Sequence, residues 1–298
     1  MLGPVTDTAV AERATPRDRV ADATDRLAWY AFAALIVTSP MAARIKLRDR
    51  SLDMVAPVYT DVLLPWTYVG VLVIVGLWAV SLACRPRPID LGPRFIWLPV
   101  VGLLIASAAG APGSIDPPLA AFNVARLLVV VAIGVYVVNE IDGIERVAVP
   151  IMLMIGVEAV VGFGQVIGQR SLGLVWLQEI RMAVGASNSS VVGAADGSRW
   201  LRAYGLSSHP NVLGGILAFA MLLLAGAQEA SRRARLVRLA VLGLGAVLLF
   251  LTFSRAAWIG FGVGLLVTVA MLAFRGDRAG VRRWASAVAV TALVGAVL

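Results

Sequence analysis

Residues 236–274 read LVRLAVLGLGAVLLFLTFSRAAWIGFGVGLLVTVAMLAF, an apolar run that is too long for one membrane-spanning helix. As a single helix it would be about 58 Å long, nearly twice the thickness of the hydrocarbon layer. Arginines gather on both sides of the run, at 232–238 and 275–283, and basic residues beside a span favour the cytoplasmic face. The chain is therefore expected to cross the membrane, turn at the outer face and return. The turn is marked by the polar residues at the middle of the run, Thr252, Ser254 and Arg255.

The composition of the whole chain points to an integral membrane protein. Of its 298 residues 59% are hydrophobic and 15% are charged, and the mean hydropathy is +0.86. Soluble domains are about half apolar and about a quarter charged, so these values exclude a soluble enzyme, a disordered protein and a nucleic-acid-binding module. The net charge of +8 comes almost entirely from arginine, which favours membrane lipids as partners over nucleic acid.

Cysteine and histidine are too scarce for several kinds of site. Cys84 is the single cysteine, which excludes an internal disulfide and a thiolate zinc site. His209 is the single histidine, which leaves no histidine-based metal cluster. No metal and no cofactor are expected.

Runs of about 20 apolar residues predict an all-α, polytopic bundle of eight or nine membrane helices. Eight spans are expected near 27–43, 62–84, 95–111, 119–138, 147–168, 211–228, 236–253 and 256–274, and a ninth begins at 285. The distribution of arginine and lysine favours a cytoplasmic N-terminus. The chain then divides into a polar N-terminus, a first group of spans, one long outer loop and a second group of spans, at 1–26, 27–168, 169–210 and 211–298. The polar N-terminus predicts no cleavable signal peptide, and the apolar run reaching Val297-Leu298 predicts a truncated chain.

The outer loop is long for a connection between spans, which is typical of a functional segment. Its first part, 172–185, carries Leu174, Leu177, Ile180 and Val184 at helical spacing. This pattern predicts a short helix, either lying in the membrane interface or packed within the loop. The small and polar segment 186–198 predicts a flexible strap that moves over a site.

The end of this loop leads straight into a span. Pro210 suits the first turn of a helix, and Ser207, Ser208 or His209 can cap it. The start of a helix offers free N–H groups and the positive end of a dipole. With Arg202 just before it, this helix start is expected to bind an anion, and a plain capped helix is the alternative.

Two motifs in this half of the chain resemble a known family. Arg202-Ala-Tyr-Gly205 is followed by His209-Pro210-Asn211, and after one span comes Leu251-Thr252-Phe253-Ser254-Arg255 with Gly260. The pair, over roughly 200–262, is similar to the O-antigen ligase and polymerase superfamily of bacterial inner membranes. The resemblance implies a metal-independent, inverting glycosyltransferase. A glycan on an undecaprenyl diphosphate carrier would move to a glycan, glycolipid or other hydroxyl acceptor on the outer face of the plasma membrane, as in lipopolysaccharide assembly.

The same resemblance assigns roles to individual residues. Arg202 and Arg255 match the motif arginines and would bind the diphosphate, while Gly205, Pro210, Asn211 and Ser254 would support them. The residues agree with this assignment, because arginine binds phosphate bidentately and can replace a metal ion. The resemblance does not assign the general base, because the residue before Pro-Asn varies in the family and its catalytic histidine lies in a further outer loop. From side-chain chemistry alone, the candidates for the base are His209 and Glu179. As alternatives, His209 contacts substrate or headgroup at the helix start, and Arg255 contacts only lipid headgroups.

Two charged residues, Arg126 and Glu158, are expected at similar depths inside predicted spans. Charges at depth usually face the interior of a helix bundle. They therefore form a structural ion pair, or Arg126 reaches the diphosphate as a third clamp. For the chain as a whole, a transporter or flippase for a lipid-linked glycan or small anion is the alternative to an enzyme, and a non-catalytic fragment or scaffold is a third reading.

Overall fold

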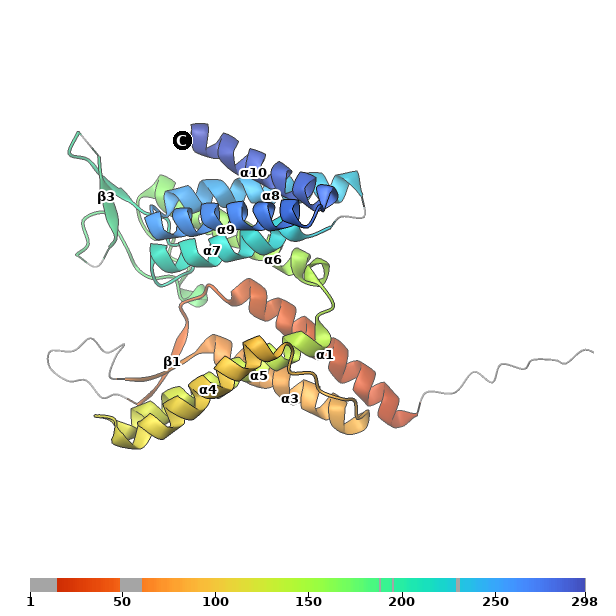
Figure 1. Ribbon diagram of the computed structural model, residues 1–298. Helices are drawn as coiled ribbons and strands as arrows, with labels where there is room; N and C mark the ends of the chain where they lie inside the picture. Colours follow the sequence, from red (N-terminus) through yellow and green to blue (C-terminus); the bar gives the residue numbers. More distant parts are fainter. Residues whose placement is uncertain (1–14, 49–60, 188, 195, 229–230, 298) are drawn as a thin grey trace, which may run out of the picture.

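The computed structural model describes residues 15–48, 61–187, 189–194, 196–228 and 231–297. This part of the chain is mostly helical (Figure 1). Its α-helices are α1 (Pro16–Thr38), α3 (Trp66–Cys84), α4 (Arg94–Gly110), α5 (Pro117–Glu140), α6 (Ile144–Gly168), α7 (Pro210–Gly226), α8 (Arg232–Leu251), α9 (Arg255–Phe274) and α10 (Arg278–Val297). Two small antiparallel hairpins complete it, β1 (Arg44–Arg48) with β2 (Val62–Pro65) and β3 (Val191–Gly193) with β4 (Arg199–Leu201). Single turns of 3₁₀ helix lie at Ala111–Gly113 and Val175–Leu177.

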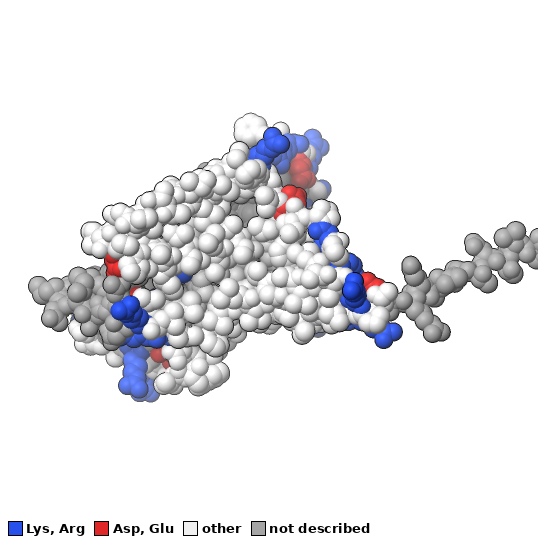
Figure 2. All heavy atoms as spheres, turned by 90° about the horizontal axis from the view of Figure 1, so that it is seen from below, with Lys and Arg blue, Asp and Glu red and all other residues white. Residues whose placement is uncertain are grey.

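Six of the described helices are long and apolar enough to cross a membrane: α3, α4, α5, α6, α8 and α9. The α7 helix is apolar but shorter, while α1 and α10 are less apolar because charged residues occupy their first turns. Figure 2 shows the same division, with an uncharged surface between charged groups at the two ends of the molecule. The structure thus supports a helical membrane protein, with six candidate spans among the described residues.

The helices form two groups that meet along α1 and α6. The first contains α1, α3, α4 and α5, and the second contains α6 to α10 (Figure 1). The α6 helix is the most buried of the six spans, because it packs on α1, α7 and α8. By contrast no residue of α4 is buried. The core therefore lies around α6, and the face of α4 is left to lipid.

Glycines let the helices of the second group approach closely. A Cβ atom added at Gly162 of α6 would lie 2.6 Å from Cδ1 of Leu248 on α8. One added at Gly264 of α9 would lie 2.6 Å from Cδ1 of Leu222 on α7. Hydrophobic burial does not drive helices together inside lipid, so close van der Waals packing at small residues supplies the attraction.

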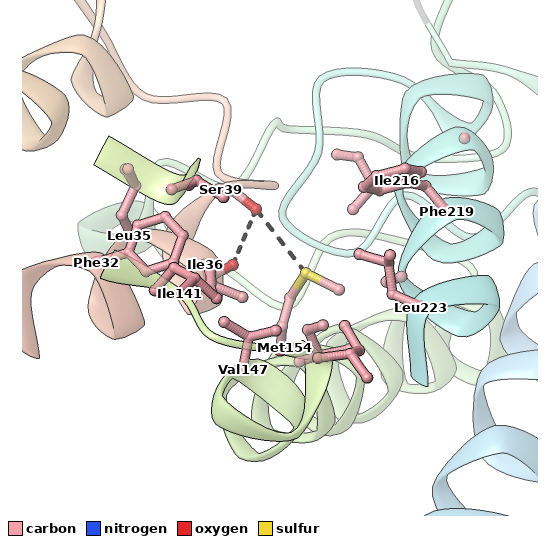
Figure 3. Close-up of a pocket in the computed structure, with 16 residues that line it drawn as sticks. Phe32, Leu35, Ile36, Ser39, Ile141, Val147, Met154, Ile216, Phe219 and Leu223 are labelled. Atoms are coloured by element: carbon pink, nitrogen blue, oxygen red, sulfur yellow. Dashed lines mark hydrogen bonds between the residues drawn. The ribbon is translucent and has the colours of Figure 1, made fainter. Parts of the chain in front are cut away.

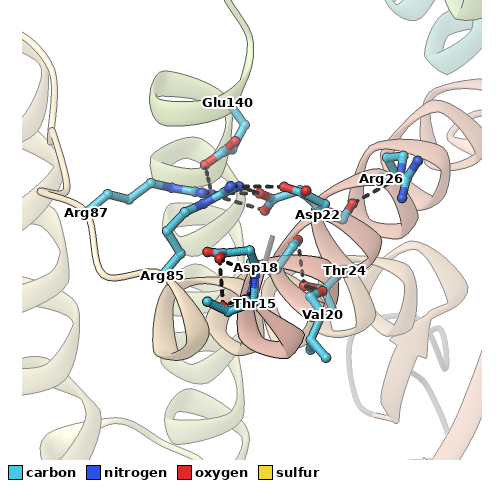
Figure 4. A network of polar contacts seen from close by, with 11 residues as sticks. Thr15, Asp18, Val20, Asp22, Thr24, Arg26, Arg85, Arg87 and Glu140 are labelled. Carbon is cyan, nitrogen blue, oxygen red and sulfur yellow. Dashed lines mark hydrogen bonds and ion pairs between the residues drawn. The ribbon is translucent and has the colours of Figure 1, made fainter. Parts of the chain in front are cut away.

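At the end of the molecule where α1 begins, ion pairs fasten the first group (Figure 4). Arg87, in the α3–α4 connection, pairs with Asp25 of α1 at 3.1 Å and with Glu140 at the end of α5 at 2.6 Å. Glu140 also accepts a hydrogen bond from Nε1 of Trp78 at 2.6 Å. These contacts join α1, α3 and α5 where their apolar segments end.

Several helices do not begin where the predicted spans do. The first helix begins at Pro16, before the span predicted from 27, because Thr15 and Asp18 form a capping box there. The predicted span at 62–84 begins with strand β2, and α3 starts only at Trp66. The last helix begins at Arg278, before the span predicted from 285.

The predicted loop helix at 172–185 is also absent from the structure. Its only helical turn is Val175–Leu177. Part of the segment predicted as a flexible strap, 186–198, forms strand β3, which pairs with β4. Residues 188 and 195 of this segment lie outside the described residues.

Candidate functional site

The predicted reversal between α8 and α9 is confirmed. The α8 helix ends at Leu251 and α9 begins at Arg255. Thr252 is fully buried, and its Oγ1 donates to the carbonyl oxygen of Leu249 at 2.6 Å and accepts from the N–H of Ser254 at 3.2 Å. Phe253 adopts the left-handed conformation with φ 48°. The turn is therefore tight and fixed by its own side chains.

Arg202 joins this turn to the start of α7. Its Nε donates to the carbonyl oxygen of Thr252 at 2.6 Å, and one terminal nitrogen donates to Oδ1 of Asn211 at 2.6 Å. The other terminal nitrogen donates to Oγ of Ser190 at 2.8 Å. No described carboxylate forms an ion pair with Arg202, so a partly buried positive charge stays uncompensated within this cluster.

The second predicted arginine stands at the same turn. Arg255 is the first residue of α9, three positions after the carbonyl that Arg202 binds. Its side chain is exposed and forms no hydrogen bond or ion pair with the residues that the structure describes. Ser254, the N-cap of α9, is buried and makes no side-chain hydrogen bond to the first turn. The first N–H groups of α9 therefore remain available as hydrogen-bond donors. The structure thus brings Arg202 and Arg255 to one turn.

Gly205 is required by a buried carboxylate. Its backbone has φ +58°, and a Cβ atom there would overlap Oε2 of Glu158. That oxygen accepts the N–H of Leu206 at 2.9 Å. Glu158 of α6 therefore holds the loop just after Arg202, and the glycine of the motif makes room for it.

Gln165 supports the same loop with both atoms of its amide. Its Oε1 accepts the N–H of Gly205 at 2.8 Å, and its Nε2 donates to the carbonyl oxygen of Gly205 at 2.7 Å. Sequence reasoning missed this residue. A signal was present, because Gln165 follows Glu158 by seven residues and so lies on the same face of α6.

Glu179, one predicted base, is a structural residue. It is buried, and its Oε1 accepts hydrogen bonds from Gln165 at 2.9 Å and from the N–H of Leu172 at 2.8 Å. Its Oε2 accepts the N–H of Leu174 at 2.8 Å. These bonds hold 172–179 as a loop, which explains why the predicted helix does not form. A carboxylate so engaged is not placed to take a proton from an acceptor.

His209, the other predicted base, caps α7. Its Nδ1 accepts the N–H of Asn211 at 3.1 Å, so the proton of the neutral ring lies on Nε2. Burial, and then the charge of Arg202, lower the pKa of His209 below its ordinary value. The ring therefore offers a donor at Nε2, and it cannot accept a proton without releasing the cap. Since Val212 and Leu213 also donate to the carbonyl oxygen of His209, α7 does not present the free N–H groups that we expected.

Pro210 and Gly214 fit α7 against the turn. Pro210 occupies the first helical position, as predicted. A Cβ atom at Gly214, one turn later, would lie 3.0 Å from the Cβ atoms of Ser254 and Ala257. This close approach places the start of α7 beside the start of α9.

Arg126 does not reach this cluster, and the predicted ion pair with Glu158 is wrong. It lies on α5, where it donates to Oδ1 of Asn123 at 3.2 Å and stands 5.0 Å from the ring centre of Tyr68 on α3. The α5 helix packs on α3 and α4, whereas α6, which carries Glu158, packs on α1, α7 and α8. Neither the pair nor the third clamp forms.

An apolar cavity of about 810 Å³ lies between α1, α6 and α7 (Figure 3). Its walls come from α1, the end of α5, α6 and α7, and include Phe32, Val147, Ile216 and Phe219. Ser39 is its polar residue at the end of α1; its Oγ contacts the carbonyl oxygen of Ile36 at 2.9 Å and Sδ of Met154 at 3.9 Å. Gly215 and Ile216 line the cavity about one helical turn beyond Asn211. The cavity therefore begins close to the arginine cluster.

Metal ligands do not gather anywhere in the described ranges: no group of three or more His, Cys, Asp and Glu side chains could hold a metal ion there. Comparison with protein-family models, with curated proteins and with solved structures finds no match.

Proposed function

We propose that this protein is a membrane glycosyltransferase of the O-antigen-ligase type, which uses a lipid diphosphate-linked glycan as donor. The observation that carries the proposal is the bond between Arg202 and the carbonyl oxygen of Thr252. It joins two motifs fifty residues apart into one cluster with two arginines. A departing diphosphate develops negative charge, which guanidinium groups placed beside it stabilise.

The hydrogen bonds of Arg202 support this role. Arginine has five N–H donors, and three bonds to Thr252, Asn211 and Ser190 fix its plane. Its remaining donors and the whole guanidinium group of Arg255 stay available to a phosphate. Burial lowers the pKa of Arg202, but arginine remains charged near neutral pH, so an anionic partner would offset the cost of burying it.

The apolar cavity supports a lipid as the carrier of the glycan. It starts one turn from Asn211 and is walled almost wholly by apolar side chains. A polyprenyl chain in this cavity would place its diphosphate next to Arg202. The undecaprenyl diphosphate of the bacterial plasma membrane has this chemistry, and the cluster would then face the outer side, with the N-terminus in the cytoplasm.

In the proposed step the hydroxyl oxygen of the acceptor attacks the anomeric carbon of the donor sugar. The bond between that carbon and the diphosphate oxygen breaks, and the electron pair leaves with the lipid diphosphate. The attack comes from the opposite side, so the configuration inverts. Arg202 and Arg255 stabilise the leaving diphosphate, while Nε2 of His209 donates a hydrogen bond at the edge of the site. The hydroxyl proton passes to solvent base.

The test is the release of undecaprenyl diphosphate by the purified protein in sealed proteoliposomes, with an undecaprenyl-diphosphate glycan, an acceptor and excess chelator. We expect metal-independent release, and a loss of about 100-fold to 1000-fold in Arg202→Ala and in Arg255→Ala. Arg199→Ala is the matched control, because Arg199 is an exposed arginine of β4 in the same loop. Movement of the intact donor across the membrane without release would contradict the proposal and indicate a carrier.

A further inference from the structure

A second cluster of arginines surrounds a cavity at the opposite end of the α7–α10 group. The cavity has a volume of about 390 Å³ and lies between α8 and α10, which pack against each other. Its lining residues are Arg235, Arg238, Ala279, Arg282, Arg283 and Ser286. Four arginines thus line one small space, and none of the described residues that line it is acidic. Like charges so close together repel one another.

Two of these arginines are anchored to the end of α7. A terminal nitrogen of Arg238, which is buried, donates to the carbonyl oxygen of Ala225 at 3.1 Å. A terminal nitrogen of Arg283 donates to the carbonyl oxygen of Gly226, also at 3.1 Å. The last carbonyls of a helix lack partners within it and carry the negative end of its dipole. The end of α7 therefore holds these two arginines in place.

The other two arginines remain available. The side chains of Arg235 and Arg282 are exposed and make no hydrogen bond or ion pair with the described residues. Two described acidic side chains stand nearby. Asp277 accepts the N–H of Gly280 at 2.8 Å, and Glu145 accepts the N–H of Gln228 at 3.0 Å and interacts electrostatically with Arg283. Because four arginines line the cavity and only these two carboxylates stand near it, the described residues around it carry a net positive charge.

The position of the cavity indicates which kind of anion it would bind. It lies where the apolar spans begin and end, since α8 starts at Arg232 and α9 ends at Phe274. Leu236 and Val237, which follow Arg235, are exposed apolar residues, and Phe274 is 93% exposed. A molecule held there has its charged group among arginines and its apolar part along the outside of the helices.

We propose that this cavity binds the headgroup of an anionic phospholipid. Arginine forks bind phosphate oxygens bidentately, and basic pockets between membrane helices recognise anionic headgroups. The bound phosphate would relieve the repulsion among the four guanidinium groups and tie α8 to α10. This site is independent of the arginine pair at Arg202 and Arg255, so its test does not depend on the proposed enzymatic activity.

The experiment is a lipid titration of the full chain in detergent, followed by native mass spectrometry. The probes are phosphatidylglycerol, phosphatidylcholine and inorganic phosphate. We expect phosphatidylglycerol to bind more tightly than phosphatidylcholine, and the double variant Arg235→Gln/Arg282→Gln to weaken that binding by about fivefold for each arginine removed. The control is Arg232→Gln/Arg233→Gln, which removes the same charge from exposed positions of α8 that do not line the cavity.

Three results would overturn the proposal. One is an equal loss in the control variant, which would indicate diffuse attraction to the whole basic end. Another is equal binding of the two lipids by the parent protein. The third is displacement of phosphatidylglycerol by inorganic phosphate at similar concentration, which would identify a free-anion site. If the double variant does not fold, Arg282→Gln alone, at an exposed position, gives the same comparison.

Discussion

Glu158 and Gly205 fit together so closely that no side chain can be placed at the glycine. The carboxylate of Glu158 is fully buried in α6, and its Oε2 occupies the space that a Cβ atom at Gly205 would need. The backbone of Gly205 is also in the left-handed region. Both the lack of space and the backbone conformation therefore require glycine at position 205, each for its own reason. The contact between Glu158 and Gly205 sets the path of the chain from Arg202 to α7.

Replacing Gly205 by alanine is expected to destabilise the protein by about 2 kcal/mol or more, because strain in the left-handed region and an overlap with Glu158 both arise. Thermal unfolding in detergent measures this effect. Gly215→Ala is the control, since a Cβ atom there meets nothing within 4 Å. Equal melting temperatures for the two variants would contradict the described path of the loop.

Glu158 is expected to act through its acceptor oxygen. Glu158→Gln keeps an oxygen for the N–H of Leu206 and should retain most of the stability. Glu158→Ala leaves that buried donor without a partner, which costs about 1–3 kcal/mol. Chemical denaturation of both variants separates these outcomes. A similar large loss in both would show that the charge itself is needed.

Arg202→Lys is expected to lose activity nearly as severely as Arg202→Ala. Lysine keeps the charge but cannot bond to Thr252, Asn211 and Ser190 in one plane. The release of lipid diphosphate under single-turnover conditions measures the loss, and Arg199→Lys is the matched control. Full activity of Arg202→Lys would mean that charge alone suffices.

His209 is expected to make the stability of the loop depend on pH. Its pKa in the folded protein is lower than its ordinary value of 6.5, because of burial and the charge of Arg202. The unfolded chain thus binds the proton more readily, so the contribution of His209 is complete above about pH 6.5 and is lost as the pH falls through the folded pKa. Melting temperatures of the parent and of His209→Asn, between pH 5 and 8, should be similar at the neutral end and should diverge at the acidic end, where only the parent loses stability. Asparagine keeps an N-cap acceptor and does not titrate, so parallel curves would refute the role of the ring.

The sequence was sufficient for the α8–α9 reversal and for the pairing of the two motifs. The length of the apolar run 236–274 and the arginines at both of its ends leave a turn near Ser254 as the simple solution. The start of α7 at Pro210 was also predictable, because proline and a cap residue mark a helix start locally.

The details of the loop between α6 and α7 could not be predicted, because they depend on partners far along the chain. Helical spacing of Leu174 and Leu177 carries no information about Glu179, whose bonds to Leu172, Leu174 and Gln165 hold the segment as a loop. In the same way, equal depth of Arg126 and Glu158 does not make their helices neighbours. Which helices touch is a property of the whole bundle, and no residue near either charge encodes it.

The segment between α6 and α7 is held by hydrogen bonds from its backbone to Glu158 and Gln165, two buried polar residues of α6. The conformation of this loop therefore depends on the packing of the helix bundle. A detergent that loosens α6 would release the loop while leaving the helical content intact. Circular dichroism would miss such inactivation, whereas limited proteolysis between residues 169 and 209 would reveal it. Preparations of this protein are best judged by that cleavage.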